Sequence, residues 1–273
     1  TESGVQRLPK IGLTVDDCLN HFRNTVSTLC CAHLFPFHFF CVFRRWIVSS
    51  GKDRLCLLWS VEHFKCIGAG IGHTDSVGSI AISQCLSSYE SKKICIFSGA
   101  GDRVLKKWAF PARGFDLPVE SEEIEALPLL CSIRAHDKDV NTLALSPNDS
   151  TLASGSQDKT IQIWNCHDLT KKGSLIGHKR GIWKIRYSPV EKTLVSCSGD
   201  RTVKIWSLDN YACLRTLEGH TASVLSITFV RDGRQLVSSS ADGLLKLWTI
   251  KTGDCEATLD NHDDKIWAVA SSD

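Results

Sequence analysis

The 273-residue sequence contains no methionine, begins with Thr1, and has no CxxC pair among its 13 cysteines. Without an initiating methionine, the chain is expected to be a fragment or the product of an incomplete gene model. The number of cysteines is odd and they are scattered, so they do not show the spacing of a disulfide framework or of a zinc site. We therefore expect free thiols in a reducing compartment, most of them buried as small hydrophobic side chains.

Long apolar runs and an excess of one charge are also missing. The longest apolar run, 29–43, is 15 residues long and contains Pro36, whereas about 20 residues are needed to span a bilayer. It also lies too far from the start to be an ordinary secretory signal. Lys+Arg total 32 against 30 Asp+Glu, a net charge of +2, while nucleic-acid-binding domains are usually strongly basic. Neither a membrane partner nor a dedicated nucleic-acid-binding domain is expected.

Sequence signatures of catalysis are absent. There is no Gly-rich phosphate loop, HExxH motif or nucleophile elbow, and SGAGD at 98–102 is interpreted as a turn between strands. We expect no enzymatic activity, cofactor, metal or small-molecule substrate.

A repeat dominates the rest of the chain. Tryptophans recur with Asp six residues before them and Ser four residues before that Asp, beginning with Trp59 and Asp53. The repeat histidines His136, His178, His220 and His262 are spaced by 42 residues three times. Each repeat holds four short strand-like runs with turns between them, as in 139–146, 151–156, 161–164 and 171–178. This pattern predicts a radial array of four-stranded antiparallel blades.

The segments from Gly177-His178 to Trp206 and from Gly219-His220 to Trp248 resemble the WD-repeat family. The resemblance covers about residues 46–271 and implies an all-β WD-repeat β-propeller. The chain departs from the family pattern at the residue after Trp and at the residue before His. These departures are Asn165, Ser207 and Thr249 in place of Asp, and Ala135 and Asn261 in place of Gly.

The repeat divides 46–273 into a partial propeller. Four full blades are expected at 76–133, 139–177, 181–219 and 223–260, with three strands of another blade at 46–72 and one strand at Lys265–Ser271. We expect part of a larger ring; a closed five-bladed ring, with the last strand completing the first blade, is the alternative.

Three segments do not fit the repeat. Residues 1–45 are expected not to be native blade sequence, and we interpret them as translated non-coding sequence or, alternatively, as a hydrophobic arm that docks on a partner. Residues 84–93 lengthen a loop. Residues 110–128 contain three prolines and five acidic residues, which indicates an extended solvated loop or a docking site for a basic partner.

Serine, histidine and aspartate recur together, which invites comparison with a hydrolase. A catalytic triad is needed once, however, whereas this set occurs four times with a Trp each time. The resemblance implies a structural hydrogen-bonded tetrad in each blade. The expected tetrads are His73, Ser98, Asp102 and Trp108; His136, Ser154, Asp158 and Trp164; His178, Ser196, Asp200 and Trp206; and His220, Ser238, Asp242 and Trp248.

Partner binding is expected on the rim of the propeller. By family analogy, the rim positions lie three and five residues after each His. They are Asp139 and Asn141, Gly181 and Trp183, Ser223 and Leu225, and Lys265 and Trp267. Lys179 and Arg180 join Trp183 in a small basic and aromatic cluster that could touch RNA or an acidic peptide. The alternative for the two tryptophans is packing against a neighbouring blade.

Stretches such as SGSQDKT, GHKRGIW and HDDKIWAV resemble the second propeller of the transducin-beta-like branch of the WD-repeat family, whose members are subunits of the small-subunit processome. The resemblance implies a nucleolar scaffold for processing of pre-ribosomal RNA. Its partners would be other propeller subunits, with the RNA contacted mostly indirectly. The alternative is a generic regulatory adaptor, for example a substrate receptor for ubiquitin ligation, that captures peptides at Trp183 and Trp267.

Overall fold

The structure of the chain is a computed structural model that describes residues 46–61, 65–83, 94–110 and 124–271, together with the backbone of 39–43. Every regular element in these ranges is a β-strand. The described residues include no helix long and apolar enough to cross a membrane.

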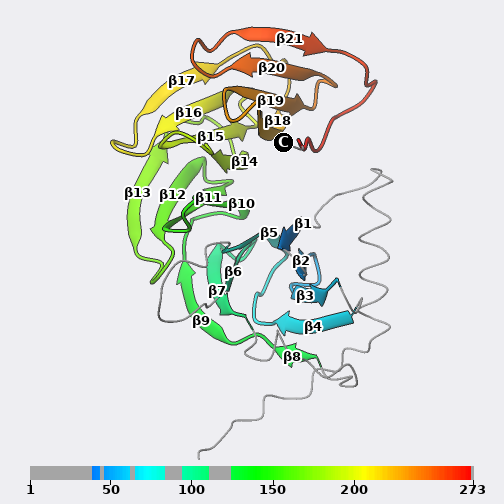
Figure 1. Cartoon of the computed structure of the whole chain (residues 1–273), viewed down its shortest axis with the longest axis vertical. Coiled ribbons are helices and arrows are strands. Elements are labelled where there is room, and N and C mark those ends of the chain that lie inside the picture. The colour runs from blue at the N-terminus through cyan, green and yellow to red at the C-terminus, as the bar shows by residue number, and fades with distance from the viewer. Residues whose placement is uncertain (1–38, 44–45, 62–64, 84–93, 111–123, 272–273) are drawn as a thin grey trace, which may run out of the picture.

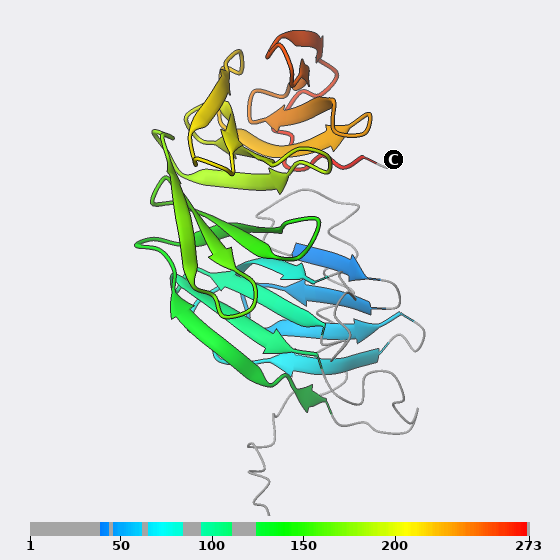
Figure 2. The ribbon, with the colours of Figure 1, turned by 60° about the vertical axis from the view of Figure 1, so that its left-hand side comes forward.

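Five sheets follow one another along a curve, as Figures 1 and 2 show. Each sheet is a propeller blade, numbered here from the N-terminus, which confirms the predicted all-β propeller architecture. Blade 1 contains β1 (Phe39–Phe43), β2 (Trp46–Ser50), β3 (Cys56–Ser60), β4 (Lys65–Gly70) and β8 (Glu125–Ala126). Blade 2 contains β5 (Val77–Ile82), β6 (Cys95–Ala100), β7 (Val104–Ala109) and β9 (Leu129–Arg134).

The other three blades are four-stranded and consecutive in sequence. Blade 3 contains β10 (Val140–Leu145), β11 (Thr151–Ser156), β12 (Thr160–Asn165) and β13 (Lys171–Ile176). Blade 4 contains β14 (Ile182–Tyr187), β15 (Thr193–Ser198), β16 (Val203–Ser207) and β17 (Cys213–Leu217). Blade 5 contains β18 (Val224–Val230), β19 (Gln235–Ser240), β20 (Leu245–Thr249) and β21 (Cys255–Leu259). Blades 2 to 5 are the four full blades that the repeat predicts.

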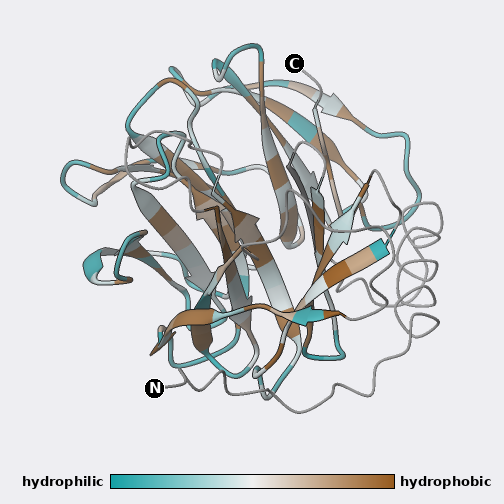
Figure 3. Cartoon of the chain, turned by 60° about the horizontal axis from the view of Figure 1, so that its bottom comes forward, coloured by the Kyte–Doolittle hydropathy of each residue, from teal (hydrophilic) through white to brown (hydrophobic). Residues whose placement is uncertain are grey.

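The hydrophobic core lies between successive blades. Trp206 of β16 is 1% exposed and packs with Ile161 and Leu175 of blade 3, and Trp248 of β20 packs in the same way against blade 4. Strand residues alternate between the two faces of a sheet, so each blade presents one apolar face to each neighbour. In Figure 3 the hydrophobic residues fall mostly in the strands, and the connecting loops are mostly hydrophilic.

The inner strands are also joined by polar contacts. The Leu143 amide of β10 donates to Ser79 Oγ of β5 at 2.8 Å. The Ile185 amide of β14 donates to Thr142 Oγ1 of β10 at 3.3 Å. A hydroxyl residue on one inner strand thus satisfies a backbone donor on the next, which fixes the position of one blade relative to another.

Strand β1 occupies the first-strand position of blade 1. Its five residues, Phe39–Phe43, pair antiparallel with all of β2. The segment 1–45 therefore contributes a strand backbone to the first blade. Its interpretation as translated non-coding sequence stays a prediction, because a backbone ladder can form with many sequences.

The prediction that residues 110–128 form a solvated loop is wrong for residues 124–128. Residues 111–123 lie outside the described residues. Strand β8 crosses from blade 2 to the outer edge of blade 1 and pairs parallel with β4. The Leu127 amide donates to Ala69 O at 2.9 Å, and the Leu127 side chain is 4% exposed in the core between blades 1 and 2. Burial of the apolar Leu127 side chain is favourable, so this part of the segment packs against the blades and is not solvated. We call residues 124–128 the strap.

The predicted strand at Lys265–Ser271 is also wrong, because this segment has no strand hydrogen bonding. Among the described residues, its links to blade 5 are a backbone bond from the Ile266 amide to Ser240 O at 3.1 Å, a bond from Ser271 Oγ to Phe229 O, and a bond between the Thr228 and Ser271 hydroxyls. A strand requires successive backbone pairs with a neighbour, and these scattered bonds do not supply them. The expected loop at 84–93 lies outside the described residues.

The cysteines with described side chains are free thiols. Cys56, Cys95, Cys166 and Cys197 are buried as expected, and burial raises the pKa of Cys56 and of Cys197 to about 12. Cys213 and Cys255 are exposed instead. Each of these two opens an outermost strand, whose residues have fewer neighbours than those of inner strands.

Candidate functional site

The predicted tetrad residues of blade 4 form a continuous hydrogen-bonded chain. His178 Nδ1 lies 2.8 Å from Asp200 Oδ2, and His178 Nε2 lies 2.7 Å from Ser196 Oγ. Trp206 Nε1 donates to Ser196 Oγ at 2.8 Å. A carboxylate can only accept, which assigns the proton to Nδ1 and leaves Nε2 of the neutral ring to accept from the serine hydroxyl. Every polar group then has a partner.

Blades 2, 3 and 5 repeat this arrangement. The distance from His Nδ1 to the nearer Asp oxygen is 2.8 Å in blades 2 and 3 and 3.0 Å in blade 5. Blade 2 is as tight as the others although its His and Asp are 29 residues apart in sequence. In blade 1, the described part of the network is the bond from Trp59 Nε1 to Ser49 Oγ at 2.8 Å.

The tetrad aspartate also fastens two loops of its blade. Asp200 Oδ2 accepts from the Lys179 amide at 2.8 Å. Asp200 Oδ1 accepts from the amide and the hydroxyl of Thr202, at 3.1 and 2.7 Å. One carboxylate therefore holds the loop after His178 against the turn between β15 and β16.

The electrostatics favour the ionised aspartate. Burial alone would raise the pKa of Asp200, but hydrogen bonds from His178 and from the Lys179 amide outweigh it and hold that pKa well below its usual range. The pKa of Asp158 is depressed in the same way, against burial, by His136 and Thr160. Burial lowers the pKa of His73 and of His220, and the hydrogen bonds that the two rings donate to Asp102 and Asp242 oppose this shift.

The tetrads have the wrong geometry for hydrolysis. Ser98, Ser154, Ser196 and Ser238 are all 0% exposed. Their hydroxyls bond to both His and Trp, so substrate has no path to the oxygen. The arrangement can fasten a blade, and the described residues hold no cluster of three or more side chains able to ligate a metal.

We expect the free energy of unfolding to fall in two stages on acidification. His73 and His220 have folded pKa values below the usual 6.5, so below pH 6.5 the unfolded chain binds protons first and stability is lost as pH falls towards those folded values. Asp158 and Asp200 have folded pKa values below 3.8, so their contribution is present above pH 3.8 and is lost at still lower pH.

Urea denaturation across this pH range measures both stages, with replacement of the exposed His167 by Gln as a control that leaves them unchanged. A free energy of unfolding that stays constant from neutral pH to pH 5 contradicts the assignment of the two histidines.

The structure separates the expected rim residues into two groups. Asp139, Lys179, Arg180, Lys265 and Trp267 are exposed, Trp267 by 41%. Gly181, Leu225 and Ser223 are half-buried, as is Asn141. Asn141 Nδ2 donates to Ile182 O at 2.7 Å, so this side chain joins blade 3 to blade 4.

Trp183 both packs against a neighbouring blade and reaches the rim, which are the two roles that the sequence allows for it. Its half-buried ring packs against the core between blades 4 and 5. Its Nε1 lies above Gly199, 3.4 Å from where a Cβ on that residue would stand. The tryptophan therefore packs between blades and still presents an edge to the rim.

Sequence analysis missed a row of basic residues immediately after the repeated aspartates, which are Asp53 in blade 1 and the tetrad aspartates of blades 2 to 4. They are Arg54, Arg103, Lys159 and Arg201, all exposed and all with φ between 68° and 73°. Blade 5 has Gly243 at this position, with φ of 80°. Left-handed backbone is costly for residues with a side chain, and the turn held by the aspartate maintains it. The signal in the sequence is the repeated Asp-Arg or Asp-Lys pair.

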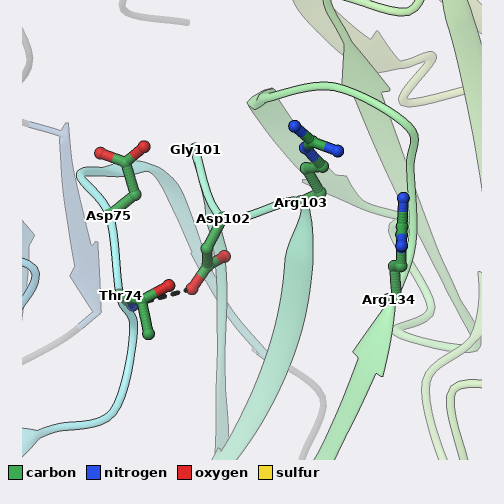
Figure 4. A pocket seen from close by; sticks show the side chains of 6 residues that line it. All are labelled: Thr74, Asp75, Gly101, Asp102, Arg103 and Arg134. Carbon is green, nitrogen blue, oxygen red and sulfur yellow. Dashed lines mark hydrogen bonds between the residues drawn. The ribbon is translucent and has the colours of Figure 1, made fainter.

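A polar pocket of about 410 Å³ lies beside the tetrad of blade 2. Its lining includes Thr74, Asp75 and Gly101, and Figure 4 shows Arg103 and Arg134 on its opposite side. Asp102 forms part of the wall, and its Oδ2 accepts from the Thr74 amide at 3.0 Å. With charges of both signs in its lining, the pocket favours no single class of ligand.

Comparison with known proteins identifies the repeats. Residues 127–165, 169–207 and 211–249 match the model of the WD domain, G-beta repeat family. Each matched repeat spans the outer strand of one blade and the first three strands of the next. Successive repeats therefore interlock at the blades.

Relatives match about half of the chain. Transducin beta-like protein 3 of Mus musculus is 41% identical over 149 residues, which are 51% of this chain and 18% of that protein. U3 small nucleolar RNA-associated protein 13 of Saccharomyces cerevisiae is 36% identical over 141 residues, 50% of this chain and 16% of that protein. Nuclear distribution protein nudF of Emericella nidulans is 38% identical over 147 residues, 48% of this chain and 29% of that protein. The match thus spans less than a fifth of the first two relatives.

Proposed function

We propose, from the premise that this chain carries WD40 repeats, that it is a non-enzymatic scaffold of the nucleolar small-subunit processome. In this role it supports pre-ribosomal RNA processing and biogenesis of the small ribosomal subunit through contacts with other propeller subunits. The support is its similarity to transducin beta-like protein 3 and to a protein named for the U3 small nucleolar RNA.

The observation that carries the proposal is that the resemblance to the transducin-beta-like branch includes exposed loop residues. Buried repeat residues are shared among propellers of many functions, so identity at those positions does not distinguish one function from another. The stretches GHKRGIW and SPVEKT, by contrast, include Lys179, Arg180, Val190 and Glu191, which are all exposed. Blade packing does not require these residue types, so partner contacts are the more economical reason for them.

Affinity purification of the tagged full-length protein from cells tests the proposal. We expect recovery of other processome propeller subunits together with pre-ribosomal RNA, and concentration of the protein in the nucleolus. Recovery of ubiquitin-ligase subunits without these components would overturn it. That result would favour the regulatory adaptor, which binds peptides through Trp183 and Trp267.

A further inference from the structure

Three exposed cations gather on the rim of blade 4. Lys179 and Arg180 follow the tetrad His178, and Arg201 follows the tetrad Asp200. The bond from the Lys179 amide to Asp200 Oδ2 holds the two segments together. Within the described part of the chain, none of the three cations takes part in an ion pair.

The nearby carboxylates leave this charge largely uncompensated. Asp200 is turned inward, with its side chain 6% exposed, and its oxygens accept from His178, Lys179 and Thr202. Glu218 is exposed at the end of β17 but lies outside 4 Å of the cations. Blade 4 therefore presents three cations and one accessible carboxylate on this rim.

The neighbouring rims have a different charge. On blade 3, Asp137 and Asp139 flank Lys138, all three exposed. Blade 5 has Thr221 and Ala222 at the positions of Lys179 and Arg180, and Gly243 at the position of Arg201. The excess positive charge is therefore a local property of blade 4, although the whole chain has a net charge of only +2.

An aromatic ring adjoins the cations. Trp183 Nε1, Arg180 Cβ and Ser223 Oγ all lie within 4 Å of the point above Gly199 where a Cβ would stand. The tetrad tryptophans donate Nε1–H to a serine, whereas the Nε1–H of Trp183, which is not a tetrad residue, has no hydrogen-bond partner among the described residues. An indole edge with a free donor thus faces the same surface as Arg180.

We propose that this surface, formed by Lys179, Arg180, Trp183 and Arg201, binds single-stranded RNA directly. The three cations engage successive phosphates, and the Trp183 indole contacts a base and donates to it. Cations that follow a backbone beside an aromatic side chain are the usual means of binding single strands. The surrounding rim residues, Gly181, Gly199 and Ser223, are small, which favours a uniformly charged polymer over a peptide that needs apolar pockets.

The proposal rests on the proposed function, because it names the partner that this rim meets within the processome. It differs from the expectation that the chain meets RNA mostly through other subunits. The near-neutral chain as a whole provides no broad electrostatic attraction, so binding depends on this local cluster.

Fluorescence anisotropy with a labelled oligouridine of about 12 nucleotides tests the surface. We expect K179A/R180A/R201A to bind at least about tenfold more weakly than the parent chain at about 50 mM salt. The plot of log K against log salt has a negative slope, and its magnitude should decrease by about 2 in this variant. Three phosphate contacts are lost, and each contact on a single strand contributes about 0.7.

The matched control is K171A/K172A/K192A, which removes the same charge at exposed positions away from the rim and should retain binding. Trp183→Phe keeps the packing between blades but removes the N–H donor, and should weaken binding without changing the salt slope. Equal losses in the two triple variants would overturn the proposal, as would absence of RNA binding by the parent chain. Tighter binding of a labelled oligoglutamate than of RNA would also overturn it and assign the surface to an acidic peptide.

Crosslinking in cells separates this inference from the proposed function. If K179A/R180A/R201A in the tagged full-length protein still recovers processome subunits but loses RNA crosslinks at blade 4, both are supported. If subunits are recovered and the crosslinks are unchanged, the RNA surface is wrong while the scaffold role stands. If the unmodified protein recovers no processome subunits, the scaffold role fails whatever the anisotropy shows.

Discussion

Replacing Trp206 with alanine should lower the free energy of unfolding by roughly 3–5 kcal/mol, as is typical of buried Trp→Ala changes. The side chain is 1% exposed and fills the space between blades 3 and 4. Its loss leaves a cavity and removes the N–H that donates to Ser196 Oγ. Urea denaturation followed by circular dichroism measures the change.

Two control substitutions test whether burial of the Trp206 ring causes this loss of stability. Trp206→Phe keeps much of the ring but loses the donor, so we expect a smaller loss, about 1–2 kcal/mol. Trp267→Ala removes an indole that is 41% exposed and should change stability by less than about 0.5 kcal/mol. If Trp206→Ala and Trp267→Ala have the same effect, the core does not lie between the blades as described.

Replacing Asp200 with alanine should lower the free energy of unfolding by about 1–3 kcal/mol. The change leaves the donors of His178, Lys179 and Thr202 without their acceptor, and His178 is buried. The midpoint of thermal unfolding should fall accordingly, and hydrogen exchange should increase in the loop after His178.

Asp209→Ala is the matched control, because Asp209 has the same side chain in an exposed ion pair with Lys192 at 3.7 Å. Such surface pairs contribute at most about 1 kcal/mol. An unchanged thermal midpoint in Asp200→Ala would contradict the view that the carboxylate fastens the blade. A midpoint lowered equally by the two changes would do the same.

The sequence predicts the features that recur in every repeat. The spacing of His, Asp and Trp specifies tetrads whose atoms lie within hydrogen-bonding distance in blades 2 to 5. A repeated pattern is informative because each copy experiences the same neighbours. The position of β8 could not be found in this way, because its pairing with β4 depends on where blade 1 lies and involves two residues.

The rim is predicted less well than the core for a related reason. Family position identifies Asn141 and Trp183 equally, yet Asn141 bonds to Ile182 across a blade junction while Trp183 retains a free donor. Such differences depend on the side chains of adjacent blades. The basic residues after the tetrad aspartates were visible as a pattern, but their common left-handed backbone became evident only in the structure.

The strap alters how unfolding can spread through the molecule. In a simple array of blades, each unit is stabilised by its immediate neighbours, and an end unit can detach at the cost of one interface. Here the strap, which lies between β7 and β9 in the sequence, adds β8 to blade 1 and buries Leu127 between blades 1 and 2. Detaching blade 1 must therefore break an outer-edge ladder as well as the inner core. Blades 1 and 2 should consequently open as one cooperative unit, although the sequence of blade 1 matches the repeat less completely than the others.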